Sequence, residues 1–178
     1  MKKLFLYSFF LAALSGCASY DDRYVSSLSV KFTGQTKWNG KLVPPRQACH
    51  ASGGKGNTPM LYVSNIPEKT NLLIMEINDL DDAALSEDGG LGSIGFYHNG
   101  DSVVTLLPVP GESYDLPPYA FREKANRVDP AKPYAYMPPC LEKKHHYSAT
   151  IKAVNRTGSF DKQKTVLLGI GEINLGRY

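Results

Sequence analysis

The chain has 178 residues, of which 42% are hydrophobic and 11% aromatic, with 20 basic against 17 acidic side chains. This length predicts one domain with a hydrophobic core of its own, and the hydrophobic fraction excludes a disordered chain. The small positive charge, without any cluster of Lys or Arg, excludes a nucleic-acid-binding protein, and no apolar run reaches the roughly 20 residues that span a bilayer.

The first 16 residues have the pattern of a bacterial export signal. Lys2 and Lys3 form a positive start, an apolar stretch runs from Leu4 to Leu14, and Leu14-Ser15-Gly16-Cys17 matches a lipobox. The pattern predicts cleavage before Cys17 and acylation of its thiol, and several acyl chains on one residue make a stable membrane anchor. The alternative is a buried cysteine in an N-terminal helix, which the charge, length and small residues of the segment disfavour.

The residue after the lipidated cysteine indicates a destination. Ala18 stands there rather than Asp, and in bacterial lipoproteins with this pattern the absence of Asp is typical of export to the outer membrane. We therefore expect a protein on the periplasmic face of the bacterial outer membrane, with a signal peptide over 1–16, an acylated tether over 17–23 and a β domain over 24–178. Removing Lys2 and Lys3 with the signal leaves 18 basic against 17 acidic side chains.

The other two cysteines, Cys49 and Cys140, form an even pair in an oxidising compartment. This predicts a disulfide between them, with two separate buried thiols as the alternative. Because two thiols without a CxxC motif do not make a structural zinc site, we expect no metal, and no cofactor is expected either.

Alternating and continuous apolar segments predict a mainly β domain. Leu28, Val30 and Phe32 alternate with polar residues, and the apolar run Leu72–Ile77 is typical of a central buried strand. The segment His98-Asn99-Gly100-Asp101 predicts a hairpin turn between the strands on either side of it. The further strand candidates are Met60–Ser64, Ile94–Tyr97, Val103–Leu107, Tyr147–Val154, Thr165–Ile170 and Ile173–Leu175.

Three Gly- or Pro-rich segments separate these strands: Ala51–Pro59, Pro108–Pro118 and Asp129–Pro139. We expect them to be ordered loops of one domain, and loops of this length in a compact domain are often functional. No helix longer than a few turns is expected, and Tyr119–Arg127 is the best helix candidate.

Three polar clusters are candidates for a binding site. Asn78–Asp82 follows the buried strand, Tyr136–Cys140 is a proline-stiffened turn, and His145-His146-Tyr147 begins an alternating strand. A two-residue period places His145 and Tyr147 on one face of that strand and His146 on the other. The alternatives are solvated loop carboxylates for the first cluster and surface histidines for the last.

In this order, the clusters resemble the phosphatidylethanolamine-binding protein family, in particular its bacterial Raf-kinase-inhibitor-like branch. Asp79-Leu80-Asp81-Asp82-Ala83 is similar to the family's Asp-Pro-Asp-Ala-Pro loop, and Pro138-Pro139-Cys140 followed by His145-His146-Tyr147 is similar to its Gly-Pro-Cys-Pro-Pro loop and His-Arg-Tyr strand. Further similar segments are Cys49, Gly56-Asn57-Thr58-Pro59, Asn65-Ile66-Pro67 and the tail Leu168–Tyr178.

The resemblance implies an antiparallel β-sandwich of a large and a small sheet with few short helices. It also implies a small pocket for an anion, such as phosphate or a phospholipid head group. Carried over by position, the ligand-binding residues are Asp79, Asp81, Pro139, His145 and Tyr147. A histidine and a phenol donate hydrogen bonds to an anionic oxygen, and carboxylates orient the histidine or accept from an amine, so the pocket would suit a zwitterion.

The chain departs from the family pattern at several positions. Leu80 replaces the loop proline, Met137 precedes the Pro-Pro-Cys turn, and Gly92 stands where the family has a histidine on the strand after the Asp loop. His98 lies on the same strand but at its far end. These departures predict a pocket that is wider than in the family, altered or lost.

Three functions remain after this reading. The first is a binding or regulatory lipoprotein with an anion or head-group pocket, and the second is a structural envelope lipoprotein that contacts a protein partner through loop residues such as Tyr114 and Tyr119. The third is a hydrolase that uses His145 with Asp79. Because no Gly-x-Ser-x-Gly elbow, metalloprotease helix or phosphate loop is present, we expect a protein that is not an enzyme.

Overall fold

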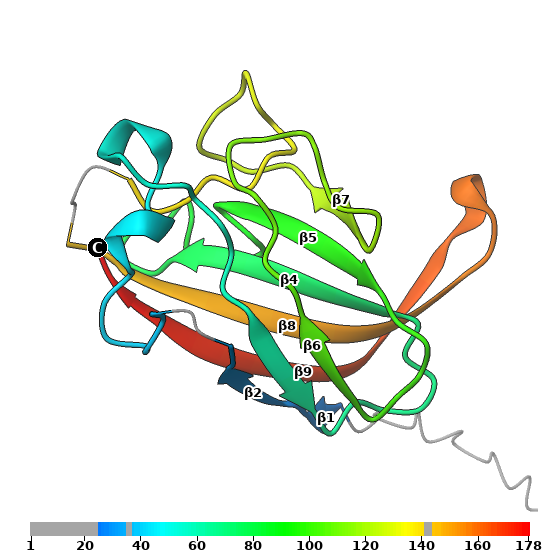
Figure 1. Ribbon diagram of the computed structural model, residues 1–178. Coiled ribbons are helices and arrows are strands. Elements are labelled where there is room, and N and C mark those ends of the chain that lie inside the picture. The colour runs from blue at the N-terminus through cyan, green and yellow to red at the C-terminus, as the bar shows by residue number, and fades with distance from the viewer. Residues whose placement is uncertain (1–24, 35–36, 141–143) are drawn as a thin grey trace, which may run out of the picture.

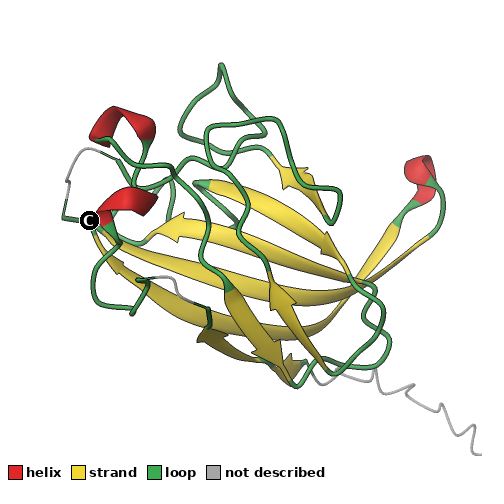
Figure 2. Ribbon diagram, in the orientation of Figure 1, coloured by secondary structure: helices red, strands yellow, loops and turns green. Residues whose placement is uncertain are grey.

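Strands dominate the described part of the chain, which comprises residues 25–34, 37–140 and 144–178 of a computed structural model. The expected signal peptide, the acylated Cys17 and the tether lie outside the described residues. The strands are β1 Ser26–Ser27, β2 Ser29–Phe32, β3 Leu61–Ser64, β4 Leu72–Asp79, β5 Gly92–Tyr97, β6 Val103–Leu106, β7 Ala120–Lys124, β8 His146–Thr157 and β9 Lys164–Arg177. Single turns of 3₁₀ helix are η1 Pro45–Gln47, η2 His50–Ser52 and η3 Phe160–Lys162, and Figure 2 shows how little of the fold is helical. The expected mainly β fold with few short helices is confirmed.

Two sheets form the body of the molecule. The larger has six strands in the order β1-β9-β8-β4-β5-β7, and the smaller has three in the order β2-β3-β6. Figure 1 shows the small sheet lying across one face of the large one, and it shows the segment that carries η1 and η2 beside the C-terminus. The result is a sandwich with loops gathered around one end.

Strand β4 lies at the centre of the large sheet, between β8 and β5, and all eight of its residues are buried. Its odd-numbered positions Leu73, Met75 and Ile77 point into the core between the sheets, where they meet Leu61 and Val63 of β3. The nearly continuous apolar run in the sequence is therefore explained by burial on both faces. The predicted central strand is confirmed.

The predicted hairpin across His98–Asp101 is wrong. β5 pairs with β4 and β7 in the large sheet, whereas β6 pairs with β3 in the small sheet. The segment does turn, since the ring of His98 bonds the Asp101 carbonyl and the Asn99 side chain bonds Asp101. The turn carries the chain from the large sheet to the small one. The two flanking strands, β5 and β6, therefore cover the core from opposite sides.

The predicted helix over Tyr119–Arg127 is also wrong. Ala120–Lys124 forms the edge strand β7, antiparallel to β5. Phe121 packs on the cluster formed by Leu72, Ile74 and Val154, on the outer face of the large sheet. Burial of the Phe121 ring against the face of the sheet favours a strand for this segment, and it outweighs the weak local helix propensity of the sequence.

The C-terminal strand is longer than predicted. β9 runs unbroken for 14 residues, so the two expected segments Thr165–Ile170 and Ile173–Leu175 are one strand paired along β8. The short β1 pairs with β9 in the parallel direction, which makes the large sheet mixed rather than purely antiparallel. Among the described residues there is no helix long and apolar enough to cross a membrane.

Candidate functional site

The end of β4 and the start of β8 bring two of the sequence clusters together. In the ladder between these antiparallel strands, Asp79 is the direct partner of Tyr147. The next residue along, Leu80, donates its backbone N–H to the carbonyl of His146 at 2.8 Å. Residues that are 68 positions apart in the sequence therefore lie side by side at one end of the large sheet.

A buried carboxylate holds the first histidine. Asp79 is 2% exposed, and the Nδ1 of His145 lies 2.7 Å from its Oδ2 and 3.0 Å from its Oδ1. A carboxylate only accepts, so the imidazole donates from Nδ1, and its Nε2 is left as the other functional atom. The backbone N–H of Asp81 donates to Asp79 Oδ1 as well, which fixes the loop after β4.

Asp81 takes the second histidine in the same way, on the outside of the molecule. Its Oδ2 accepts from the backbone N–H of His146 at 2.6 Å and from the ring Nδ1 at 2.8 Å. These hydrogen bonds from His146 lower the pKa of Asp81 below its ordinary value. Asp81 and His146 are half-exposed and clamp the loop to β8 from the surface.

A cavity of about 220 Å³ lies beside this pair. Of the five residues predicted to bind a ligand, Asp79, Pro139 and Tyr147 line it, whereas His145 adjoins it through Asp79 and Asp81 does not line it. The other lining residues are Cys49, Leu85, Leu91, Glu112, Val128, Met137, Pro138 and Cys140. The cavity thus has an apolar wall with carboxylates and a phenol set into it, which is the usual composition of a small-molecule site.

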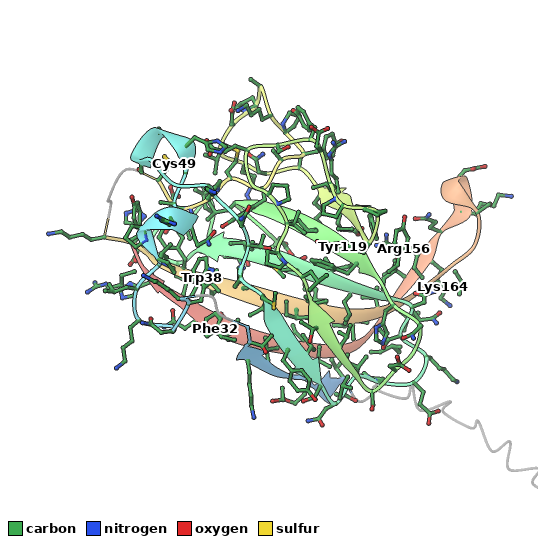
Figure 3. The ribbon with its side chains drawn as sticks, viewed as in Figure 1. Phe32, Trp38, Cys49, Tyr119, Arg156 and Lys164 are labelled. Atoms are coloured by element: carbon green, nitrogen blue, oxygen red, sulfur yellow. A yellow bond between two sulfur atoms is a disulfide. The ribbon has the colours of Figure 1, made fainter. Side chains whose placement is uncertain are left out.

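A disulfide joins two walls of this cavity. Cys49 and Cys140 are bonded, which confirms the predicted pair, and Figure 3 shows the bond next to η2. The backbone N–H of Cys49 also donates to the carbonyl of Pro139 at 3.0 Å. The segment before η2 and the proline turn before β8 are therefore locked together.

Sequence reasoning missed a third histidine–carboxylate pair at the cavity. Glu112 lines it, and its Oε2 lies 2.9 Å from the Nδ1 of His50 and accepts the backbone N–H of His50 at 2.7 Å. Glu112 has a φ of 52°, in the left-handed region, and its own N–H donates to the carbonyl of Tyr136. The one sequence signal that could have found His50 is its position next to Cys49.

Two phenols lie close to these carboxylates. Burial, and then the negative charges of Asp79 and Asp81, raise the pKa of Tyr147 well above its ordinary value of 10. Burial likewise raises the pKa of Tyr136, with Tyr147 and Glu112 adding to the effect. Both phenols are therefore protonated donors, and the buried hydroxyl of Tyr136 has no hydrogen-bond partner among the described residues.

Backbone packs closely against Gly92, the position at which the family resemblance would place a histidine. A Cβ at Gly92 would lie 2.9 Å from the Cα of Tyr136 and 3.2 Å from the carbonyl oxygen of Ala135. Gly92 also has a φ of 133°. The segment that carries Tyr136 thus occupies the space that a side chain at Gly92 would need, and the expectation of a pocket that is wider than in the family, altered or lost stays a prediction.

Metal-ligating side chains do not converge in the described part of the chain. His50, His145 and His146, all near this end of the large sheet, are each paired with their own carboxylate, and no group of three or more His, Cys, Asp or Glu residues among the described residues could hold a metal ion. The two cavity cysteines are bonded to each other.

No protein-family model and no curated protein matches the chain. Among solved structures it is similar to the crystal structure of a protein described as a phosphatidylethanolamine-binding protein homolog, from Chlamydia trachomatis. The two share 18% sequence identity with a TM-score of 0.49, over 86% of this chain and 97% of that one. By its description, that protein is a homolog of the family whose motifs this chain resembles.

Proposed function

We propose that the protein is a lipid-anchored periplasmic binding protein of the outer membrane, and that its cavity takes a small zwitterion such as a phospholipid head group. The observation that carries this proposal is the convergence of Asp79, Tyr147 and Pro139 on one cavity with His145 bonded to Asp79. The anchor rests on the lipobox at Cys17. The protein binds its ligand and does not transform it.

The charges of the cavity favour a zwitterion over a simple anion. Asp79 and Glu112 place two carboxylates in its wall, and they would repel a free phosphate unless a cation came with it. An ammonium group satisfies these carboxylates, while the Tyr147 phenol donates to an anionic oxygen. Phosphoethanolamine carries both groups within one small molecule.

The cavity contains no activated nucleophile among its described lining residues. Its two sulfur atoms are bonded to each other, and the lining has neither Ser nor Thr. His145 already donates to Asp79, an arrangement that orients an imidazole but needs a nucleophile to become a catalytic pair. These features support binding over hydrolysis.

The test is a calorimetric titration of the purified full chain with phosphoethanolamine, ethanolamine and inorganic phosphate in parallel. We expect phosphoethanolamine to bind most tightly. Tyr147→Phe removes one hydrogen bond to a charged group and is expected to weaken binding about 10- to 100-fold. Tyr97→Phe, on the opposite face of the sheet, is the matched control and is expected to bind as the wild type does.

Either of two results would contradict the proposal. One is the absence of saturable phosphoethanolamine binding by the wild-type chain. The other is binding that is unchanged in Tyr147→Phe, because the ligand would then lie outside this cavity. A ligand that binds without displacing the hydrogen bond between His145 and Asp79 shifts the ring resonances of His145 in an NMR spectrum. The proton on Nδ1 of His145 stays hydrogen-bonded to Asp79 in that case.

A second function, an envelope lipoprotein that acts through protein contacts, is favoured by the exposed tyrosines of the long loops. Tyr114 and Tyr119 are exposed, yet their hydroxyls bond the carbonyls of Ala131 and Pro108, which fixes the loops as one surface. Chemical cross-linking in intact envelopes separates the two functions. A cross-linked partner that is lost in a Tyr114→Ala, Tyr119→Ala double variant but kept in His145→Ala would favour this second function.

A further inference from the structure

A second recess lies on the outer face of the large sheet, away from the cavity described above. It measures about 740 Å³, within the roughly 300–1,000 Å³ typical of small-molecule sites. Leu72, at the start of β4, lines it, whereas Asp79 at the other end of β4 lines the first cavity. Seven residue steps along the strand separate Leu72 from Asp79 by about 23 Å, so the two sites are distinct.

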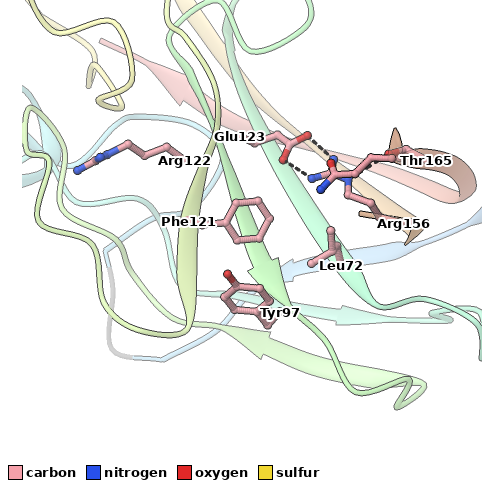
Figure 4. Close-up of a pocket in the computed structure, with 9 residues that line it drawn as sticks. Leu72, Tyr97, Phe121, Arg122, Glu123, Arg156 and Thr165 are labelled. Atoms are coloured by element: carbon pink, nitrogen blue, oxygen red, sulfur yellow. Dashed lines mark hydrogen bonds and ion pairs between the residues drawn. The ribbon is translucent and has the colours of Figure 1, made fainter. Parts of the chain in front are cut away.

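Two aromatic rings form one wall of this recess (Figure 4). Tyr97 is 66% exposed, and its ring lies 5.0 Å from that of Phe121, centroid to centroid. A Cβ at Gly95 would overlap the ring of Phe121, so the glycine lets this ring lie directly on β5. The strand pair thereby holds an aromatic surface rigidly against a floor of Leu72, and keeps it open to solvent.

Hydrogen-bonding side chains line the opposite wall. The guanidinium of Arg156 makes a two-pronged ion pair with Glu123, and its Nε donates to Thr165 Oγ1 at 3.0 Å. An arginine has five N–H donors, and among the described residues this side chain uses three of them. Donors and carboxylate lone pairs therefore remain available side by side, with Gln163 as a further polar lining residue.

The charge of this wall is balanced. Arg156 and Glu123 neutralise each other, and the remaining cation, Arg122, is engaged elsewhere: its guanidinium lies 4.8 Å from the ring centroid of Tyr114 and donates to the Tyr114 carbonyl. Figure 4 shows Arg122 directed away from the other labelled side chains. The polar wall beside the aromatic rings is thus neutral as a pair, with the Arg122 charge directed away from it, whereas the first cavity has two carboxylates in its wall.

We propose that this recess is a binding site for a neutral saccharide. A pyranose ring has an apolar face of C–H groups, which packs on an aromatic surface, and a rim of hydroxyls that both donate and accept hydrogen bonds. The recess matches both properties, because the Tyr97 and Phe121 rings provide the flat apolar surface and the Arg156–Glu123 pair provides adjacent donors and acceptors. An apolar peptide would leave that polar wall unpaired.

The experiment titrates the full chain with chitotriose and maltotriose, two neutral trisaccharides, by calorimetry and saturation-transfer NMR. We expect saturable binding of at least one of them, with transfer to the C–H protons of the sugar ring. Tyr97→Ala removes the exposed ring and is expected to weaken binding about tenfold or more, whereas Tyr97→Phe keeps the ring and is expected to stay within about twofold.

Two controls make the result specific. Tyr62→Ala removes another exposed tyrosine, which lies on β3 of the small sheet, and is expected to bind both sugars as the wild type does. Asp79→Asn alters the first cavity and is likewise expected to leave sugar binding unchanged, so the two sites fail independently. Failure of both sugars to bind the wild-type chain at about 10 mM, or equal binding by Tyr97→Ala, overturns the proposal.

Discussion

Gly92 offers the sharpest test of how the cavity is built. Replacing it with alanine adds one carbon atom at a position where the two nearest atoms belong to the backbone, the Cα of Tyr136 at 2.9 Å and the carbonyl oxygen of Ala135 at 3.2 Å. Neither can move out of the way as the end of a flexible side chain could. The φ of 133° adds a second penalty, because residues with a Cβ rarely adopt it.

The expected loss of stability follows from the steric contact and the positive φ at Gly92. A residue with a Cβ in a sparsely populated backbone region costs about 1–3 kcal/mol, and forcing extra volume into a packed site costs about 1–3 kcal/mol more. We therefore expect Gly92→Ala to lower the free energy of unfolding by about 2–6 kcal/mol. For a chain of this length, that lowers the melting temperature by roughly 4–24 °C.

Thermal and urea denaturation followed by circular dichroism measure this effect, and Gly53→Ala is the matched control. Gly53 also has a positive φ, of 75°, but a Cβ there meets nothing within 4 Å. The control therefore keeps a positive-φ penalty, the smaller one of the left-handed helical region, and lacks the steric one. If Gly92→Ala were no more destabilising than Gly53→Ala, the conclusion that the backbone of the Tyr136 segment leaves no room for a side chain at Gly92 would be refuted.

Three further predictions follow from contacts around the two faces of the large sheet. Replacing both disulfide cysteines with alanine opens a loop of 91 residues and is expected to lower the free energy of unfolding by about 2–5 kcal/mol in urea titrations; a change below about 1 kcal/mol would contradict the role given to the bond. Glu76→Gln removes the charge of a 3% exposed carboxylate whose Oε2 lies 2.7 Å from Lys152 Nζ. We expect this variant to lower the free energy of unfolding by about 2 kcal/mol at neutral pH. The control is Glu172→Gln, which removes an exposed carboxylate on β9. Hydrogen bonds from His146 lower the pKa of Asp81, so the stabilisation of the fold by the ionised Asp81 is present above the ordinary pKa of an aspartate and is lost as the pH falls through the lowered pKa. Asp81→Asn should therefore reduce the loss of folding stability below about pH 4. An unchanged loss of stability at acid pH in this variant would contradict the prediction.

The strands were predictable from sequence where burial repeats along the chain. The run Leu72–Ile77 identified β4 because both of its faces are covered, and the alternation at Leu28, Val30 and Phe32 identified β2 because one face is. Partner choice was not predictable. The turn at His98–Asp101 is a correct local signal, yet the strands around it join different sheets, since pairing is decided by distant strands such as β3 and β4.

The site was predictable where the polar residues continue a strand. Asp79 ends β4 and Tyr147 lies near the start of the neighbouring strand β8, and it was the resemblance to the family motifs that predicted one site for both. Glu112 lies in the loop after β6 and His50 in the 3₁₀ turn η2, 62 residues apart, and neither belongs to a periodic segment that could have predicted their contact. The occupation of the space at Gly92 depends on the backbone path near Tyr136, which no local pattern of residues encodes.

The short parallel strand β1 fixes where the described chain enters the large sheet. Ser26 pairs with Gly169 of β9, whereas Tyr147 of the cavity is opposite Gly176. Seven residue steps along β9 separate those two glycines, about 23 Å, and the parallel sense of β1 places Ser26 at the end of β1 farther from the cavity. A force applied at Ser26 would therefore be taken up by β1 and β9, at the end of the sheet away from the cavity.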